Sequence, residues 1–298
     1  MKILLLGKNG QLGWDLQWDL VSLGTLYTPD RSQLDLTNKN DIYSYITDVN
    51  PNVIVNAAAY TNVDKAETEP DMAFLVNAEA AGWIADAAAK CQAALIHFST
   101  DYVFDGGKTN PYRESDEANP INVYGKSKLA GEGKIRENSA AYIILRTSWL
   151  YSWHHNCYLT KILKLARSAQ NLQIVTDQTG SPTSRRLLAE ITGQLIALSL
   201  PEPFRFFNEN HGIYHLAGDG AVNRFRFTEA ILAKDPNKDK HICNAIQPVD
   251  SSFFPQRAKR PSFSALNCDL FTQKFHLRLP PWEVGLHLTM NELGFQNG

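Results

Sequence analysis

The chain has 298 residues, enough to bury a large core as one big domain or as two smaller ones. Its 44% of hydrophobic and 20% of charged residues are typical of a globular protein. The net charge of -2 comes from 29 basic and 31 acidic residues that are intermixed, which argues against a nucleic-acid partner.

Cysteine usage and hydropathy exclude two further classes of protein. The four cysteines are far apart and form no C-x-x-C motif, so we expect neither a disulfide framework nor a cysteine metal site. No apolar stretch approaches the roughly 20 residues that span a bilayer, and we expect no membrane attachment. A reducing, cytoplasmic location follows as a prediction.

The first half of the chain alternates short apolar runs with helical patterns. The expected strands cover residues 3–6, 25–28, 53–56, 94–98 and 142–146, and the expected helices 11–23, 71–90 and 123–138. Such alternation is typical of βαβ units, and these units build a parallel sheet covered on both faces. We therefore predict an α/β fold with a Rossmann-type, doubly wound parallel sheet.

The second half continues the alternation more loosely. Helices are expected over 159–169, 185–200 and 225–233, strands over 172–176 and 213–217, and a loop over 248–261, which is rich in Pro, Ser and basic residues. We predict a dinucleotide-binding domain over residues 1–150, to which part of 172–200 returns. The remainder, over 151–298, is expected to be mainly a smaller C-terminal substrate-binding domain.

A glycine-rich loop follows the first expected strand and opens the first expected helix. Gly7, Gly10 and Gly13 have the spacing G-x-x-G-x-x-G, with Gln11 and Leu12 between them. Glycines there allow a tight turn and a close approach of the backbone to a pyrophosphate, which the helix N-terminus attracts. Because the pattern sits at the first βα junction, we predict dinucleotide binding rather than an ordinary turn.

The residues after the second strand address the choice of cofactor. Asp30 stands where an acidic residue would hold the adenosine ribose of NAD. Alternatively, Asp30 is an ordinary turn residue after Pro29. Arg31 could instead neutralise the 2′-phosphate of NADP. The sequence permits NADH as well as NADPH, and we favour NADPH slightly. Asp35 and Leu36 follow, where contacts to adenine could form.

Tyr124 is the only one of the eleven tyrosines with a lysine, Lys128, four residues later. On a helix this spacing places both side chains on one face. We expect the ammonium to lower the pKa of the phenol, so that it can protonate a carbonyl oxygen. Thr100 lies just after the expected strand 94–98. Its hydroxyl could hydrogen-bond that oxygen, or merely cap a turn. No carboxylate–histidine cluster has zinc spacing, and we predict no metal site.

These segments together resemble the extended short-chain dehydrogenase/reductases, and within them the dTDP-4-dehydrorhamnose reductase family. The segments that carry the resemblance are GKNGQLGW at 7–14, VIVNAAAYTNVDKAETE at 53–69, STDYVF at 99–104, NVYGKSKLAGE at 122–132, RTSWL at 146–150, DQTGSPT at 177–183 and residues 257–261. Two places depart from the family, namely Tyr60, in a slot that is often histidine, and the run SWHHNC at 152–157.

The resemblance implies specific roles for residues at the matching positions. The cofactor would contact residues of the glycine loop, the adenosine-end residues and the strand end at 59–61, that is Gly7, Gly10, Gln11, Leu12, Gly13, Asp30, Arg31, Asp35, Leu36, Ala59, Tyr60 and Thr61, together with Tyr124 and Lys128. The catalytic set would be Thr100, Tyr124 and Lys128. The sugar nucleotide would contact Thr100, Asp101 and Trp149, with Arg260 as a weaker candidate for its diphosphate.

The implied activity is the NAD(P)H-dependent reduction of the C4 keto group of dTDP-4-dehydro-L-rhamnose to dTDP-L-rhamnose, the last step of dTDP-rhamnose biosynthesis. The partner would be a dTDP-sugar. The resemblance leaves room for a homodimer and for Mg²⁺, for which the sequence shows no site. Two alternatives stay open, namely a non-catalytic subunit like the regulatory subunit of methionine adenosyltransferase, and another sugar-nucleotide epimerase or dehydratase.

Overall fold

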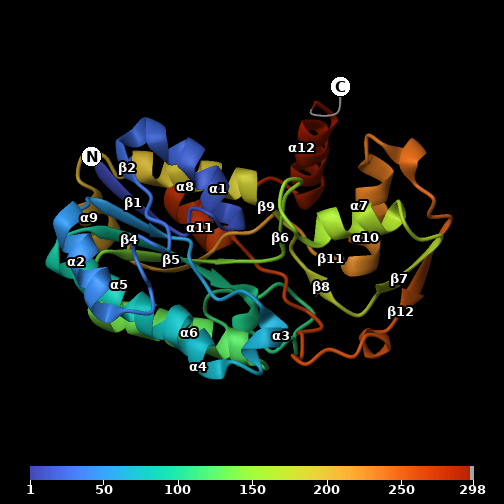
Figure 1. Cartoon of the computed structure of the whole chain (residues 1–298), viewed down its shortest axis with the longest axis horizontal. Coiled ribbons are helices and arrows are strands. Elements are labelled where there is room, and N and C mark those ends of the chain that lie inside the picture. The colour runs from blue at the N-terminus through green and yellow to red at the C-terminus, as the bar shows by residue number, and fades with distance from the viewer. Residues whose placement is uncertain (296–298) are drawn as a thin grey trace.

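Six parallel strands form the sheet that carries the site. The computed structural model describes residues 1–295 and orders them β10-β5-β4-β3-β1-β2 (Figure 1). The strands are β1 (Lys2–Leu6), β2 (Thr25–Tyr27), β3 (Val53–Asn56), β4 (Ala94–Thr100), β5 (Tyr142–Thr147) and β10 (Gly212–His215). The residues of β3, β4 and β5 are all buried, as in parallel strands covered on both faces. The predicted doubly wound α/β fold is confirmed.

Helices on one face of the sheet come from both halves of the chain. They are α1 (Gln11–Leu20), α8 (Arg185–Leu198), α9 (Pro203–Glu209) and α11 (Asp269–Phe275). Leu16 of α1, Leu188 of α8 and Phe207 of α9 share one apolar cluster with Ile96 of β4. Helix α8 therefore belongs to the layer over the sheet, although it follows β5 by almost forty residues.

The opposite face is covered by α2 (Lys39–Val49), α5 (Ala80–Lys90) and α6 (Val123–Asn138). Ile42, Ile84 and Ile135 of these helices pack around Leu95 of β4. The single helix expected over 71–90 is interrupted. It consists of α4 (Pro70–Phe74), the π-helical segment η2 (Leu75–Glu79) and α5.

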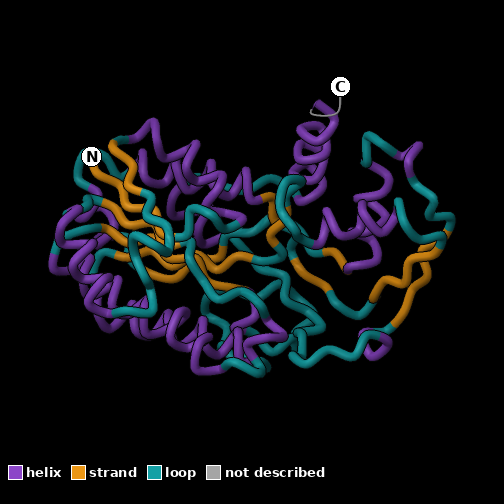
Figure 2. The backbone as a smooth tube through the Cα atoms, viewed as in Figure 1, coloured by secondary structure: helices purple, strands orange, loops and turns teal. Residues whose placement is uncertain are grey.

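The remaining elements form a second, smaller unit beside the sheet (Figures 1 and 2). They are β6 (Leu150–Tyr151), α7 (Tyr158–Ala166), β7 (Asn171–Val175), β8 (Thr179–Gly180), β9 (Thr183–Ser184), β11 (Val222–Asn223), α10 (Arg224–Lys234), β12 (Ala245–Val249) and α12 (Trp282–Phe295). Leu163, Phe227 and Leu286 lie in its core. The expected loop at 248–261 begins inside β12, which pairs in parallel with β7.

Short helical turns complete the chain at η1 (Val21–Leu23), α3 (Val63–Ala66), η3 (Asp101–Val103), η4 (Lys238–Lys240) and η5 (Ser251–Phe253).

We propose that the substrate-binding unit comprises about 150–184, 219–264 and 282–295, because α8, α9, β10 and α11 lie with the sheet. Within residues 1–295, no helix combines the length and the apolar character that crossing a bilayer requires.

The glycine loop joins β1 to α1 by a turn that excludes side chains. Gly7 has φ +88°, and a Cβ atom there would lie 2.7 Å from the backbone nitrogen of Ala58. A Cβ atom on Gly13 would penetrate the carbonyl oxygen of Gly7. Gly13 therefore lets α1 approach the turn.

We expect Gly13→Ala to lower the free energy of unfolding by about 1–3 kcal/mol, because the added methyl group overpacks the loop against the helix. Thermal unfolding without ligand measures this change. Gly133→Ala is the matched control on α6, since no atom lies within 4 Å of its added Cβ. That control should be neutral or stabilising. Equal changes in the two variants would contradict the packing argument.

Candidate active site

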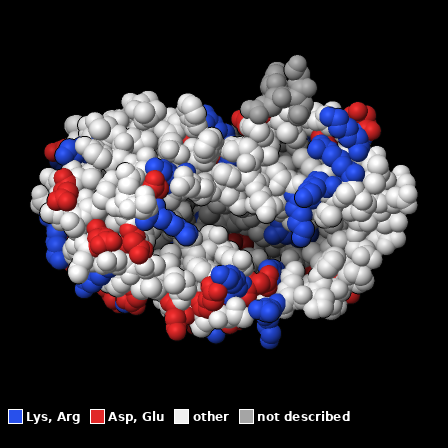
Figure 3. All heavy atoms as spheres, viewed as in Figure 1, with Lys and Arg blue, Asp and Glu red and all other residues white. Residues whose placement is uncertain are grey.

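The carboxyl ends of β1 to β5 open into a cavity of about 1310 Å³. Figure 3 shows a hollow in this face of the molecule with Lys and Arg side chains around it. The volume exceeds the roughly 1,000 Å³ of the larger pockets for one small molecule. The cavity therefore has room for two ligands side by side, at the edge where open α/β sheets bind them.

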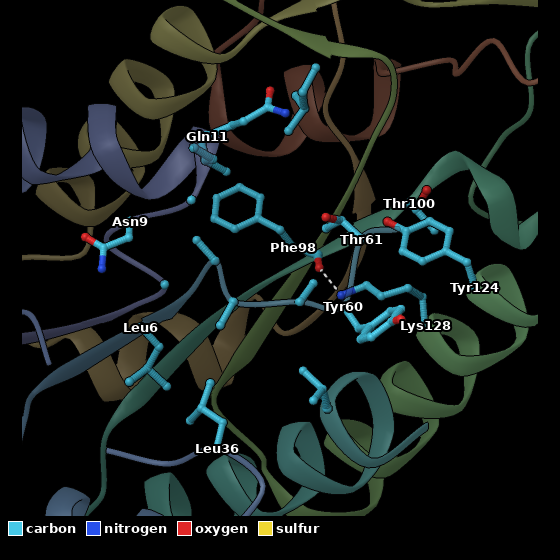
Figure 4. A pocket seen from close by; sticks show the side chains of 18 of the residues that line it. Leu6, Asn9, Gln11, Leu36, Tyr60, Thr61, Phe98, Thr100, Tyr124 and Lys128 are labelled. Atoms are coloured by element: carbon cyan, nitrogen blue, oxygen red, sulfur yellow. Dashed lines mark hydrogen bonds between the residues drawn. The ribbon is translucent and has the colours of Figure 1, made fainter. Parts of the chain in front are cut away.

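Most of the residues predicted from the sequence line this one cavity. They are Gly7, Gly10, Gln11, Leu12, Asp30, Arg31, Asp35, Leu36, Ala59, Tyr60, Thr61, Thr100, Asp101, Tyr124, Lys128 and Trp149. Gly13 and Arg260 are not among the lining residues. Figure 4 shows Gln11 and Asn9 at one end of the cavity, with Thr100, Tyr124 and Lys128 at the other.

The adenosine end of the cavity carries two cations, Lys8 and Arg31, and two carboxylates, Asp30 and Asp35. Asp30 accepts hydrogen bonds from the backbone and hydroxyl of Ser32, at 2.9 and 2.6 Å, and these bonds lower its pKa. The ammonium of Lys8 lies 3.7 Å from the other carboxylate oxygen of Asp30. Arg31 is exposed on the cavity wall. The charges at this end balance, so an anionic group would be held there by direct contact with a cation such as the exposed Arg31.

The strand end at 59–61 is held by the π-helical segment η2. The side chain of Asn77 accepts from the backbone N–H of Tyr60 at 2.8 Å and donates to its carbonyl at 3.0 Å. Asn77 also donates to the hydroxyl of Ser127 on α6 at 2.9 Å. One buried amide thus ties the cavity wall to α6, and the wide π turn presents it.

The start of α6 is fixed from three sides. Asn122 caps it by accepting from the backbone N–H of Gly125, at 2.8 Å, and donates to the carbonyl of Lys259. The backbone N–H of Val123 donates to the carboxylate of Glu67 at 2.8 Å. A Cβ atom on Gly125 would collide with the carbonyl of Tyr102, so the glycine brings α6 against η3. These contacts position Tyr124 and Lys128, whose spacing places both toward the cavity.

Thr100 and Tyr124 meet at the end of β4. The hydroxyl of Thr100 lies near the phenol of Tyr124, whose pKa it lowers, and it donates to Asp101 Oδ1 at 3.2 Å. Asp101 also accepts from Ser148 at 2.9 Å and from Ser264 at 2.6 Å. Burial raises the pKa of Asp101 to about 6, against the lowering by these hydroxyls. The carboxylate therefore organises hydroxyl groups from both units of the chain.

The pKa of Tyr124 differs from the expectation. Burial raises it above its ordinary value, the nearby hydroxyl of Thr100 lowers it, and the charge of Asp101 raises it. The amine of Lys128 does not offset this burial, because it donates to the carbonyl of Phe98 at 2.6 Å and lies 3.1 Å from His97 Nε2. The prediction that Lys128 holds the pKa of Tyr124 low is therefore wrong for this structure. Burial lowers the pKa of Lys128 itself to about 8.

Trp149 occupies the substrate side of the cavity in a constrained conformation. Its φ of +45° lies in the left-handed region, which is unusual for a bulky residue and is often found at functional sites. The guanidinium carbon of Arg224 lies 3.4 Å from the Trp149 ring centroid and 4.4 Å from that of Tyr158. A Cβ atom on Gly180 would collide with the indole. The aromatic platform thus carries a cation that lines the cavity.

Arg260 is engaged elsewhere in this structure. Its guanidinium forms two contacts with the carboxylate of Asp64, at 2.7 and 3.2 Å. It also lies near Tyr102, which lines the cavity. Its part in substrate binding stays a prediction. The run 152–157, one of the two departures from the family, approaches α1, where Gln11 Nε2 donates to the carbonyl of Asn156 at 3.3 Å.

A buried ion pair joins α6 to the sheet. Arg146 donates to Glu132 from Nε at 2.9 Å and from Nη2 at 2.7 Å, and both side chains are at most 5% exposed. The hydroxyl of Ser99 donates to the same carboxylate at 2.5 Å. One carboxylate on the helix of Tyr124 and Lys128 thus binds β4 and β5 together.

Among residues 1–295, no group of three or more His, Cys, Asp and Glu side chains could hold a metal ion. Reasoning from the sequence missed several polar residues of the site, namely Lys8, Asn56, Asn77, His97, Ser148 and Arg224. Asn56 and His97 sit inside strands, and Asn77 in an alanine-rich helix, so no local pattern separated them from core residues. The charge of Arg224 was visible, but nothing in the sequence brought it near Trp149.

Comparison with known proteins supports one family. The family described as RmlD substrate binding domain matches residues 1–295. The dTDP-4-dehydrorhamnose reductase of Escherichia coli (strain K12) is 39% identical over 98% of each chain, and that of Salmonella typhimurium is 40% identical over 98% of each chain. A solved structure of dTDP-4-dehydrorhamnose reductase from Bacillus anthracis, in complex with NADP, is similar with a TM-score of 0.88 and 34% identity, covering 98% of this chain and 99% of that chain.

We expect Glu132→Gln to lower the free energy of unfolding by about 3–5 kcal/mol, because Arg146 keeps its buried charge without a counter-charge. Chemical denaturation measures this loss. Glu137→Gln provides the control, since Glu137 is an exposed residue of the same helix. An equally small effect of both substitutions would show that the ion pair does not hold α6 in place.

Proposed function

This chain belongs to the RmlD substrate binding domain family, and from that membership we propose that it catalyses the last step of dTDP-rhamnose biosynthesis. The reaction is the NADPH-dependent reduction of the C4 keto group of dTDP-4-dehydro-L-rhamnose to give dTDP-L-rhamnose. The observation that carries this proposal is the meeting of Thr100, Tyr124 and Lys128 in the cavity that the glycine loop also lines. A carbonyl reduction needs a hydride carrier and a proton donor at one place.

The residues of the first unit fit a dinucleotide. Gly7 leaves no space for a side chain beside Ala58, and α1 begins with free N–H groups that suit a pyrophosphate. Lys8 and Arg31 flank Asp30, which supports NADPH through its 2′-phosphate over NADH. When bound, the reduced nicotinamide would supply the hydride for C4.

The proton follows from the side chains at the end of β4. Thr100 would turn its hydroxyl proton from Asp101 to the carbonyl oxygen, and Tyr124 would transfer its proton to that oxygen as the hydride arrives at C4. Because burial holds the pKa of Tyr124 high, a protonated Lys128 beside it would stabilise the phenolate that remains. The ketone thereby gains one hydride and one proton and becomes the alcohol.

The substrate would lie between these groups and the smaller unit. Trp149 offers an aromatic face for the deoxysugar, as predicted from the sequence, and Arg224 places a cation over that ring, where it suits the diphosphate. Asp101 would act mainly by orienting the hydroxyls of Thr100, Ser148 and Ser264.

We assign the reaction to the cytoplasm, because all four cysteines are free. A homodimer stays a prediction.

The proposal is tested by the loss of NADPH absorbance when purified protein is mixed with dTDP-4-dehydro-L-rhamnose. Tyr124→Phe should lower kcat by about 10²–10⁴-fold, because the carbonyl oxygen loses its proton donor. Tyr45→Phe on α2 is the matched control, and its activity should equal that of the wild type. Folded protein without turnover would contradict the activity, and an active Tyr124→Phe variant would remove Tyr124 from its role.

We expect Arg31→Ala to raise the KM for NADPH by about 10–100-fold, the size of one charge-assisted hydrogen bond, and to leave the KM for NADH nearly unchanged. Steady-state kinetics with each cofactor at saturating substrate measure the two values. Arg136→Ala removes an exposed cation from α6 and should change neither. An equal effect of Arg31→Ala on both cofactors would show that Arg31 does not recognise the 2′-phosphate.

A further inference from the structure

A line of hydrogen bonds runs through the sheet to the amine of Lys128. The backbone N–H of Ala58 donates to Asn56 Oδ1 at 3.1 Å, and Asn56 Nδ2 lies 3.1 Å from His97 Nδ1. His97 Nε2 lies 3.1 Å from Lys128 Nζ. The same amine donates to the carbonyl of Phe98 at 2.6 Å (Figure 4). The Asn56, His97 and Lys128 side chains are 3%, 1% and 1% exposed, so water does not replace these partners.

The register of the sheet creates this line. Asn56 of β3 and His97 of β4 are direct partners in the parallel pairing, so their side chains extend from the same face. Lys128 reaches them from α6, which covers that face. On the β5 side, His97 is paired with Ile144, which has no polar group to offer. The imidazole therefore has Asn56 on one nitrogen and Lys128 on the other.

The direction of each bond in the line is determined at its first member. A backbone N–H can only donate, so the amide oxygen of Asn56 must face Ala58 and its NH₂ group must face His97. His97 Nδ1 then accepts, and the proton of the neutral ring lies on Nε2. Nε2–H points at Lys128 Nζ, and only a neutral amine has a lone pair to receive it.

A protonated Lys128 forces a conflict somewhere in the same line. An ammonium has three donors and no acceptor, so His97 would have to accept at Nε2 and carry its proton on Nδ1. That proton would face the NH₂ group of Asn56, or Asn56 would rotate and bring its NH₂ group against the N–H of Ala58. Either arrangement leaves two donors opposed in a buried place, which is costly.

The surroundings of the line either favour the neutral forms of His97 and Lys128, or consist of charged groups that are already paired with other residues. Burial, and then the charge of Lys128, hold the pKa of His97 well below its ordinary value, so the ring is neutral. Burial also lowers the pKa of Lys128 to about 8, while Glu132 opposes this. Glu132 is bound to Arg146 and Ser99, and it lies one turn beyond Lys128 on α6.

We propose that Asn56 and His97 are positioning residues that act through Lys128, holding its amine in place and favouring its neutral form. The proposal builds on the reductase function, in which a positive Lys128 stabilises the phenolate of Tyr124. The line then determines the pH above which that positive charge, and with it kcat/KM, is lost. Asn56 and His97 touch neither the carbonyl oxygen nor the phenol, so their effect passes through the amine alone.

The tautomer of His97 can be measured without any enzyme assay. Long-range ¹H–¹⁵N spectra of protein labelled at histidine nitrogens distinguish the proton on Nε2 from that on Nδ1, and the signal lost in His97→Gln identifies His97. We expect a neutral ring with its proton on Nε2 above about pH 9, where Lys128, whose pKa burial lowers to about 8, has lost its charge. A proton on Nδ1, or a doubly protonated ring, would overturn the proposal even if the reductase is active.

Reversing the line gives a second, kinetic test. Asn56→Asp offers only acceptors, so His97 would carry its proton on Nδ1 and accept from the ammonium of Lys128. The alkaline fall of kcat/KM should then move up by about one pH unit or more. In a His97→Leu background, where no relay exists, Asn56→Asp should move it by clearly less. An unchanged limb, or equal shifts in the two backgrounds, would contradict the relay, whereas an inactive wild type with the Nε2–H tautomer would contradict only the reductase function.

Discussion

The arrangement of the site depends on one buried carboxylate. Glu132 holds Arg146 of β5 and Ser99 of β4 from the helix that also carries Tyr124 and Lys128. The hydrogen bonds of Asn122 and Glu67 hold the start of α6, but without the charged anchor its later turns would rest on apolar contacts around Ile135, which permit small rotations and translations. An ion pair with two parallel bonds resists both movements. Small shifts matter here, because proton transfer requires donor and acceptor within hydrogen-bonding distance.

The electrostatics of the site follow from the burial of Tyr124 and Lys128. Burial keeps a proton on Tyr124 and lowers the pKa of Lys128 to about 8, so both groups adopt their neutral forms more readily than they would in water. A neutral phenol costs little to maintain in a buried place, and the phenolate becomes favourable only when new polar partners arrive. The chemistry is thereby restricted to the moment when the cavity is filled.

Much of the fold was predictable from the sequence, because its signals are local. The apolar run of β1, the glycines of the loop after it and the helix over 123–138 each carry their own pattern, and the structure agrees with them. The polar interior of the site was not predictable in the same way. Asn56 and His97 become neighbours only through the register of β3 and β4, and Arg224 reaches Trp149 from a different part of the chain. The electrostatic expectation for Tyr124 failed for the same reason, since spacing on a helix says nothing about burial or about competing partners for Lys128.

The π-helical segment η2 has a consequence for how this protein can be altered. A π turn accommodates one residue more than a regular helix, and here the extra residue turns Asn77 toward Tyr60 and Ser127. Deleting one residue between Leu75 and Glu79 would restore a regular helix from Pro70 to Lys90. It would also rotate the amide away from the cavity wall. Engineering for heat resistance should therefore leave this irregularity intact, because Asn77 of η2 fixes the loop at Tyr60 relative to α6 at Ser127.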